Sequence, residues 1–179
     1  MKNTDIKKIL DLTFLKDGAK KSDLIDFCIK ANKIMPKAVC VFAENAEFVK
    51  SNLDKKINLA LVSRPFPVGS NSVNEIGYNI SEALDLGADE IDCVLEPRSD
   101  SDFPGEVELQ KLIEMRNACG EKILKIIIEA PKLDERKMRA VIRLVLLCGA
   151  DYVKSGTGHR GICTKEQAII LAEEVYRHK

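Results

Sequence analysis

The sequence predicts an α/β protein in which βα units repeat around a parallel sheet, and three observations support this prediction. Short runs of β-branched residues alternate with longer segments of helical period, as such units require. The chain has 179 residues, 45% of them hydrophobic, which is enough for one sizeable core. A pattern beginning Gly-Ala-Asp occurs twice, at residues 87–92 and 149–154. We therefore expect a single domain over residues 1–179.

The strands are expected where short apolar runs stand between turn-forming residues. Five such runs are clear, and a sixth at the start of the chain is weaker. In chain order the predicted strands are residues 9–14, 38–43, 57–63, 90–96, 123–130 and 151–156.

The helices are expected between the strands, where start and stop signals flank apolar residues at helical spacing. The first begins at Ser22, and the last starts from a capping box of Thr164 and Gln167 and runs to residue 176. Each of the other three ends at a glycine, which favours the left-handed conformation of a helix end. These three predicted helices are residues 74–86, 106–118 and 134–148, followed by Gly87, Gly120 and Gly149.

Composition excludes several classes of partner. The 28 basic and 28 acidic side chains cancel and are scattered, so we expect no nucleic-acid or membrane partner and favour a small molecule. No run reaches the roughly 18 apolar residues of a membrane span, and no apolar leader follows the polar N-terminus. The six cysteines lie far apart without a C-x-x-C pair and are expected to be core thiols in a reducing compartment. We expect a cytoplasmic protein without a metal site.

The repeated pattern places two charged residues in the same strand phase. Its sixth position is Asp92 in the first copy and Lys154 in the second. If each glycine ends a helix and each strand begins at the same offset, both side chains face the same side of the sheet. Alternate strands of a barrel fill the same interior layer, so a carboxylate and an amine are expected to meet in one pocket.

An inward lysine predicts carbonyl chemistry. Apolar surroundings penalise the ammonium form, and a free amine condenses with carbonyl compounds to make and break carbon–carbon bonds. Asp92 is then a candidate for relaying protons. The alternative is structural: Lys154 extends to solvent at a strand end and Asp92 pairs with it or caps a loop. Lys125, a charge inside an apolar strand, is a further candidate, either in the site or as an ion-pair partner of Asp92 or Glu129.

A glycine-rich turn, residues 155–161, follows Lys154 immediately. Its backbone N–H groups could hold a phosphate or another oxyanion, and His159 and Arg160 add positive charge. A plain tight turn is the alternative. A second turn of this kind covers residues 65–71.

Segments along nearly the whole chain resemble class I deoxyribose-phosphate aldolases. They are D-x-T-x-L at 11–15, V-C-V at 39–41, F-P-V-G at 66–69, G-A-D-E-I-D at 87–92, L-K-I-I-I-E at 124–129, G-A-D-Y-V-K at 149–154 and G-T-G at 156–158. The resemblance implies a TIM-barrel-type (β/α) fold and a Schiff-base mechanism with no added cofactor. The implied reaction is the reversible cleavage of 2-deoxy-D-ribose 5-phosphate to D-glyceraldehyde 3-phosphate and acetaldehyde.

The resemblance also implies roles for individual residues. Lys154 corresponds to the Schiff-base lysine and Asp92 to the proton-relay acid, and we add Lys125 to the catalytic candidates. We add His159 to the substrate-binding candidates because of its place in the turn. The residues implied to line the pocket or to place the substrate and its phosphate are Asp11, Thr13, Leu15, Cys40, Thr157 and Gly158.

The chain differs from the family in length and in the turn. Family members continue into a seventh strand with a second lysine and an eighth strand that completes the phosphate site, so we expect about six of the usual eight βα units here. Ser155-Gly156 replaces the usual Thr-Ser. Six strands leave open sheet edges, and we expect association with another copy or with a complementing chain.

Two other functions fit the same residues. One is a shortened, weakly active or inactive homologue that serves as a sugar-phosphate binding or scaffolding subunit. The other is a different Schiff-base aldolase on a related barrel, which would keep Lys154 and change the substrate.

Overall fold

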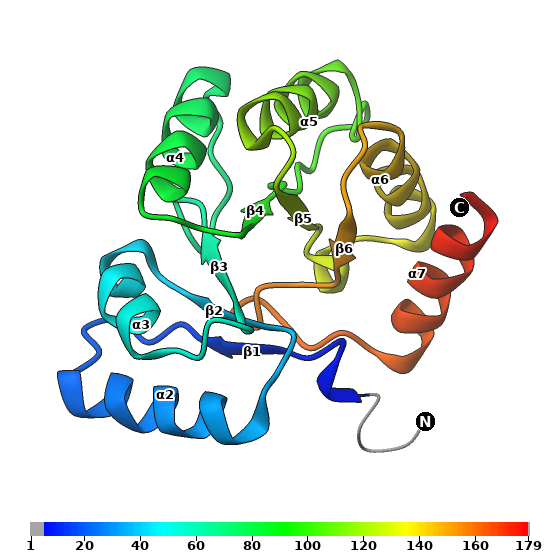
Figure 1. Ribbon diagram of the computed structural model, residues 1–179. Coiled ribbons are helices and arrows are strands. Elements are labelled where there is room, and N and C mark those ends of the chain that lie inside the picture. The colour runs from blue at the N-terminus through cyan, green and yellow to red at the C-terminus, as the bar shows by residue number, and fades with distance from the viewer. Residues whose placement is uncertain (1–5, 179) are drawn as a thin grey trace. The chain divides into compact units, whose positions relative to one another are not determined.

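The computed structural model describes residues 6–178, in which six strands form a sheet of order β1-β2-β3-β4-β5-β6 (Figure 1). The strands are β1 (Asp11–Phe14), β2 (Ala38–Val41), β3 (Asn58–Val62), β4 (Glu90–Val94), β5 (Ile123–Ile127) and β6 (Tyr152–Lys154). The helices are α2 (Lys21–Ile34), α3 (Ala46–Asn52), α4 (Val73–Asp85), α5 (Glu106–Cys119), α6 (Glu135–Leu147) and α7 (Lys165–His178), with short 3₁₀ helices at Ala43–Asn45 and Ala130–Lys132. Strands and helices therefore alternate as predicted.

All six predicted strands are present, but several of them were predicted to extend beyond the ends that the structure shows. The strand predicted over 123–130 ends at Ile127, because Glu129 adopts a left-handed conformation with φ of 50°. The strand predicted over 90–96 ends at Val94. The apolar residues beyond these ends, Leu95 and Ile128, are each 1% exposed, so the apolar run continues past the strand because these residues are also buried.

The helix ends follow most of the predicted signals. Gly87 and Gly149 have φ of 82° and 78°, the positive values that favour glycine after a helix. The backbone N–H of Thr164 donates to Gln167 Oε1 at 3.0 Å, and the Gln167 N–H donates to Thr164 Oγ1 at 3.2 Å, which confirms the capping box. The predicted start at Ser22 was wrong, since α2 begins at Lys21. Helix α3 was missed, because its seven residues are too few for a clear period.

The described residues form two compact parts, which we treat separately. Unit 1 contains residues 6–62 and 82–91, and unit 2 contains residues 63–81 and 92–178. The boundary between them passes through α4 and β4. The single domain expected over 1–179 remains a prediction, and residues 1–5 and 179 lie outside the described part of the chain.

Unit 1 is stabilised by apolar packing of helices on parallel strands. Thr13 of β1 lies opposite Cys40 of β2, and Cys40 lies opposite Ala60 of β3. All four residues of β2 are buried. The buried residues of α2 recur at helical spacing: Leu24, Phe27, Cys28 and Ala31. The ring of Phe27 stacks on that of Phe14 with centroids 5.1 Å apart, which fixes α2 against β1.

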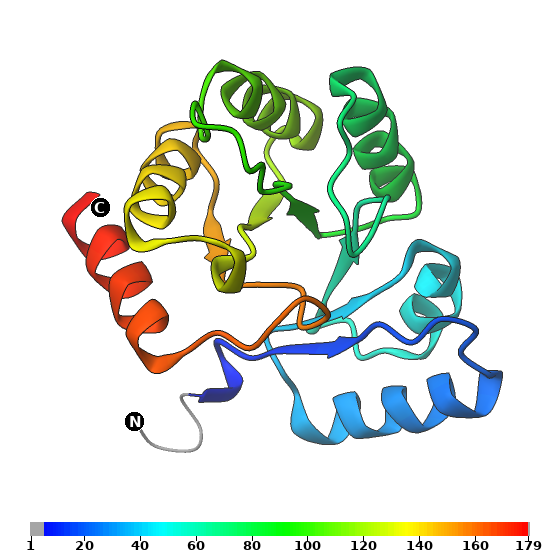
Figure 2. The same cartoon turned by 180° about the vertical axis from the view of Figure 1, so that it is seen from behind.

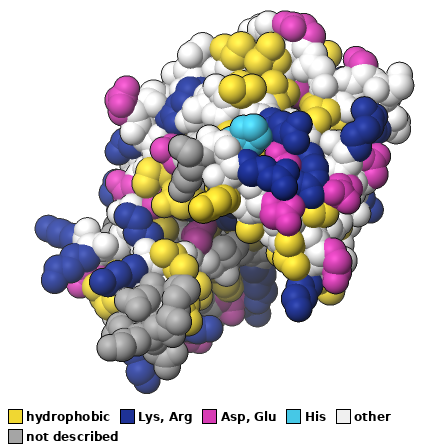
Figure 3. Space-filling model, turned by 90° about the vertical axis from the view of Figure 1, so that its right-hand side faces the viewer, with side chains coloured by type: hydrophobic (Ala, Val, Ile, Leu, Met, Phe, Trp, Pro, Cys, Tyr) yellow, Lys and Arg dark blue, Asp and Glu magenta, His cyan; other side chains and the backbone are white. Residues whose placement is uncertain are grey.

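Unit 2 has α5 and α6 on one face of its strands, with α7 beside α6 (Figures 1 and 2). The buried residues of α6 again recur at helical spacing: Met138, Val141, Ile142 and Val145. Between α6 and α7, the buried carboxylate of Glu174 accepts hydrogen bonds from Arg139 at 2.7 Å and Arg143 at 2.8 Å. Figure 3 shows the side of the molecule that carries α7, where basic and acidic side chains gather around a histidine.

The repeated Gly-Ala-Asp pattern has the same local structure in both copies. The Asp89 N–H donates to the carbonyl of Leu59, and the Asp89 carboxylate accepts from the Leu59 N–H at 3.0 Å. In the second copy Asp151 makes the same two contacts with Leu124, the second of them at 2.9 Å. Each aspartate thus sets the register of its strand against the preceding one, a role that the sequence did not reveal.

Among the described residues, none of the helices combines the length and the apolar character needed to cross a bilayer.

Candidate active site

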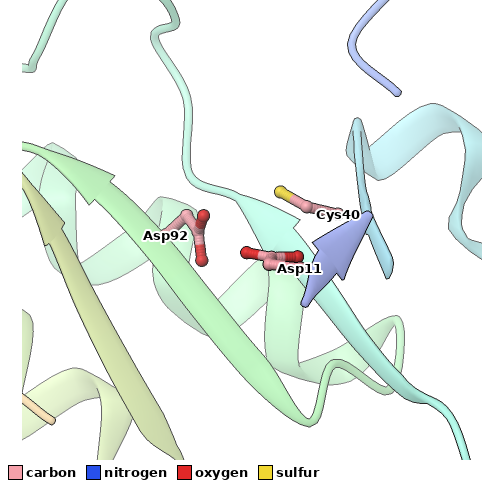
Figure 4. A group of neighbouring side chains, drawn as sticks. All are labelled: Asp11, Cys40 and Asp92. Carbon is pink, nitrogen blue, oxygen red and sulfur yellow. The ribbon is translucent and has the colours of Figure 1, made fainter. Parts of the chain in front are cut away.

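Two lysine amines contact one aspartate carboxylate in unit 2, and the three side chains come from three strands. Asp92 projects from β4 and its side chain is completely buried (Figure 4). The Lys154 Nζ of β6 donates a hydrogen bond to Asp92 Oδ2. The Lys125 Nζ of β5 lies 3.3 Å from Asp92 Oδ1. The structure therefore brings together the three residues predicted as catalytic.

The strand register explains why these side chains converge. Lys154 lies opposite Ile127 in the parallel β5–β6 pair, and Lys125 lies two residues before Ile127 on the same face. The end of β4 is tied to β5 by the Leu95 N–H, which donates to the carbonyl of Ile127 at 2.9 Å. Backbone hydrogen bonds thus hold the strands that carry the three charges, so their geometry does not depend on a loop.

The two amines differ in their access to solvent. The Lys125 side chain is 6% exposed, whereas that of Lys154 is 26% exposed. A reactant arriving from solvent can therefore reach the Lys154 amine more easily. The arrangement places one amine in direct contact with a carboxylate and a second amine near the other carboxylate oxygen, which are groups that imine formation and proton transfer require.

The neighbouring thiol is not part of this chemistry. Burial raises the pKa of the Cys93 thiol, and the charge of Asp92 acts in the same direction. Cys93 therefore stays protonated and inert.

The glycine-rich turn after β6 is held by a buried carboxylate. Glu129 is 1% exposed and accepts a hydrogen bond from the Thr157 N–H. The Thr157 hydroxyl accepts from the His159 N–H at 3.2 Å. Gly158 lies between them with φ of 81°, a conformation that favours glycine. These three substrate-binding candidates thus share one ordered turn close behind Lys154.

Sequence reasoning missed a second carboxylate at the same turn. Glu96 Oε2 accepts from Arg160 at 2.7 Å and from the Gly69 N–H at 3.1 Å. Glu96 and Arg160 are 64 residues apart in the chain, so no local pattern could have paired them. Arg160, which was expected to add positive charge to the turn, forms an ion pair with Glu96.

The four remaining candidates belong to unit 1. Asp11 and Thr13 lie on β1, and the Thr13 hydroxyl donates to the carbonyl of Asp11 at 3.4 Å. Leu15 follows β1 directly, and Cys40 is a fully buried residue of β2. Figure 4 draws the side chains of Asp11 and Cys40 on these neighbouring strands.

Comparison with known proteins agrees with this geometry. The model of the DeoC/LacD family aldolases matches residues 6–178. The deoxyribose-phosphate aldolase of Caldicellulosiruptor saccharolyticus is 31% identical to this chain over 184 residues, covering 100% of the chain and 83% of that protein. The corresponding enzyme of Finegoldia magna is 32% identical, covering 98% of the chain and 82% of that protein.

Solved structures share the fold. A Coccidioides immitis protein assigned as a deoxyribose-phosphate aldolase superposes with a TM-score of 0.87 at 25% identity, covering 99% of this chain and 70% of that one. The tetrameric deoxyribose phosphate aldolase of Aeropyrum pernix superposes with a TM-score of 0.83 at 20% identity, covering 98% and 75%. The TIM-barrel-type fold class is thereby confirmed, and the chain is a member of the DeoC/LacD family of aldolases.

Proposed function

We propose that this protein cleaves 2-deoxy-D-ribose 5-phosphate reversibly to D-glyceraldehyde 3-phosphate and acetaldehyde, through a Schiff base on Lys154. The observation that carries the proposal is the contact of the Lys154 amine with the buried Asp92 carboxylate, which also contacts Lys125. Relatives of this chain that are about one third identical are named for this activity.

The first step is imine formation. The neutral Lys154 amine attacks the aldehyde carbon of the open-chain sugar, and the carbinolamine loses water to give an iminium ion. Asp92 touches the amine, so it can receive the proton that the amine releases and return it to the departing hydroxyl. Lys125 holds the second oxygen of Asp92 and keeps the carboxylate in place during these transfers.

The second step breaks the bond between C2 and C3 of the sugar. A base removes the proton of the C3 hydroxyl, the bond electrons move into the iminium to form an enamine, and D-glyceraldehyde 3-phosphate leaves. The enamine is then protonated at C2, and water releases acetaldehyde from the lysine. Asp92 is the buried carboxylate in contact with Lys154, and we assign it the proton transfers of this step.

The phosphate group is assigned to the turn after β6. Gly158 and His159 lie within it, and Thr157 completes the set of binding candidates in unit 2. Asp11, Thr13, Leu15 and Cys40 of unit 1 remain proposed pocket residues. Backbone N–H groups in a glycine-rich turn suit an anion because they offer donors without bulky side chains.

Borohydride trapping tests the Schiff base directly. The protein is incubated with acetaldehyde and reduced, and its peptides are analysed by mass spectrometry. We expect an ethyl group on Lys154, because reduction converts the iminium into a stable secondary amine.

Two variants serve as controls for trapping. Lys154→Arg keeps the positive charge and cannot form an imine, so it should give no adduct at this position. Lys165→Arg changes an exposed lysine of α7 and should trap like the wild type. Folded protein without an adduct on Lys154 would refute the proposal.

The non-catalytic alternative is not favoured, because the family and the similar proteins are aldolases. A different aldolase substrate is tested by comparing turnover across several aldehyde and sugar-phosphate pairs. A higher kcat/KM for another pair than for deoxyribose 5-phosphate would replace the substrate and keep the role of Lys154.

We also propose that the chain associates with a second copy of itself. The alternative is association with a different chain that supplies the missing strands. Three large apolar side chains of unit 2 are strongly exposed, Leu147 at 83%, Ile162 at 90% and Tyr176 at 88%. Covering them would remove apolar surface from water. Light scattering should give a mass above that of one chain, and a monomer across micromolar concentrations would contradict this. The six cysteines of the described residues form no disulfide, which is consistent with the proposed cytoplasmic location.

A further inference from the structure

We infer that Glu96 and Arg160 are positioning residues that hold the turn after β6 in the shape that receives the substrate phosphate. This inference rests on the proposed function and extends it to two residues to which the proposed reaction assigns no step. It follows from how the two ends of the turn are attached to the rest of unit 2.

A single carboxylate oxygen joins three connections between strands and helices. Glu96 follows β4, and its Oε2 accepts from Gly69, in the turn after β3, and from Arg160, in the turn after β6. The ring of His159 contacts the ring of Phe66 edge to face with centroids 5.5 Å apart, which is a second link between the same two turns. The turn after β6 is therefore attached to the turn after β3 through two consecutive residues of its own, His159 and Arg160.

The turn after β3 is itself firmly held, so it provides a fixed support. Gly69 packs so closely on the end of β4 that an added Cβ would collide with the carbonyl oxygen of Val94. Asn71 Oδ1 accepts a hydrogen bond from Lys111 at 3.2 Å, and Lys111 is 2% exposed. The hydroxyl of Ser70 donates to Glu75. Glu96 thus connects Arg160 to backbone that cannot shift freely.

Two carboxylates hold the two ends of the turn. Glu129 receives the N–H of Thr157 at the start, and Glu96 receives the guanidinium of Arg160 at the end. Gly158 lies between these fixed points. Its backbone N–H is the group that we assign to the anion, and a fixed turn does not have to be ordered when the anion binds.

The positive charge of Arg160 is paired with the carboxylate of Glu96. The Glu96 carboxylate raises the pKa of the Arg160 guanidinium, and the charge of Glu129 contributes in the same direction. The Glu96 side chain is 14% exposed and that of Arg160 is 26% exposed, so the pair is only partly screened by water. Arg160 thereby neutralises a carboxylate that would otherwise repel a phosphate near the turn.

The test compares phosphorylated and unphosphorylated deoxyribose with Glu96→Gln, Arg160→Met and the double variant. In each variant we expect the KM for deoxyribose 5-phosphate to rise about tenfold, with kcat and the KM for deoxyribose changed less than about twofold. The double variant should be no worse than the poorer single variant, because both changes disrupt one contact. Arg160→Lys retains a cation and should restore most of the affinity.

A binding measurement tests the inference without turnover. Calorimetry with inorganic phosphate should give a dissociation constant about tenfold higher in Arg160→Met than in the wild type. Arg143→Met is the matched control, since it removes an arginine that is ion-paired elsewhere in unit 2, and it should bind phosphate like the wild type. Thermal unfolding establishes that each variant is folded.

Two results would overturn the inference. One is unchanged phosphate affinity in folded Arg160→Met, and the other is an equal rise in KM for both sugars, which would indicate a general structural effect. If the proposed function itself were wrong, the wild type would give no acetaldehyde adduct on Lys154. If only the role of Glu96 and Arg160 were wrong, the adduct would still form. We expect it to form equally in wild type, Glu96→Gln and Arg160→Met.

Discussion

Two completely buried carboxylates of unit 2 are surrounded by different kinds of cation. Asp92 on β4 contacts the amines of Lys125 and Lys154. Glu174 on α7 accepts hydrogen bonds from the guanidinium groups of α6, at 2.7 Å from Arg139 and 2.8 Å from Arg143. In both clusters one buried carboxylate contacts at least two positive charges, with Arg177 as a third at 3.5 Å from Glu174. The clusters lie in different places, one among strands and one between helices.

The difference between an amine and a guanidinium decides what each cluster can do. A lysine amine can lose its proton and become a nucleophile, whereas an arginine remains charged in proteins. The cluster around Asp92 can therefore take part in imine chemistry. The cluster around Glu174 can only join α6 to α7. A buried ion pair is thus no indication of catalysis until its cations are identified.

The largest expected effect is that of Lys154→Met. Removing the amine abolishes imine formation, and we expect kcat to fall by at least about 10³-fold. Asp92 keeps its contact with Lys125, so the protein should still fold. Steady-state kinetics and circular dichroism measure the two effects, and activity within tenfold of wild type would show that another group forms the imine.

Asp92→Asn should reduce both activity and stability. The amide cannot accept a proton, so kcat should fall by about 10²- to 10⁴-fold. Loss of the charge also removes the buried carboxylate that the amines of Lys125 and Lys154 contact, which should cost about 3–5 kcal/mol of unfolding free energy. Kinetics and urea unfolding report the two effects, and an active variant would remove Asp92 from the proton transfers.

Glu174→Gln should separate stability from activity. We expect the free energy of unfolding to decrease by about 1–3 kcal/mol, because hydrogen bonds to two charged groups are weakened. The value of kcat should stay within about twofold of wild type, because α7 contributes none of the proposed catalytic groups. Urea unfolding and kinetics of this one variant test the contrast with Asp92→Asn, and a large loss of kcat would contradict it.

The smallest effect is the pH dependence of the Glu174 cluster. Arg143 and then Arg139 lower the pKa of Glu174 from an ordinary value of 4.5 to about 2. Because the pKa is lower in the folded state, the stabilisation is complete above about pH 4.5 and is lost as the pH falls towards 2. The stability difference between wild type and Glu174→Gln should shrink over that range. A difference that stays constant would contradict the assignment.

Sequence patterns predicted the parts of the site that repeat or that form local structure. The two Gly-Ala-Asp copies predicted that Asp92 and Lys154 share a strand phase, and their side chains are in contact. The positive φ values of Gly87 and Gly149 confirm the predicted helix ends. The strand ends were less predictable, because Leu95 and Ile128 are buried although they lie beyond their strands.

The sequence by itself determined the alternation of strands and helices, the family and the catalytic lysine candidate, because these depend on local periodicity and on motifs of a few residues. The repeat also predicted that Asp92 and Lys154 meet, but only the tertiary structure decided how the other charges pair. It pairs Glu96 with Arg160 across 64 residues of chain and places Lys125 at 3.3 Å from Asp92. Such contacts arise from strand register and turn geometry, which bring together residues that share no local pattern.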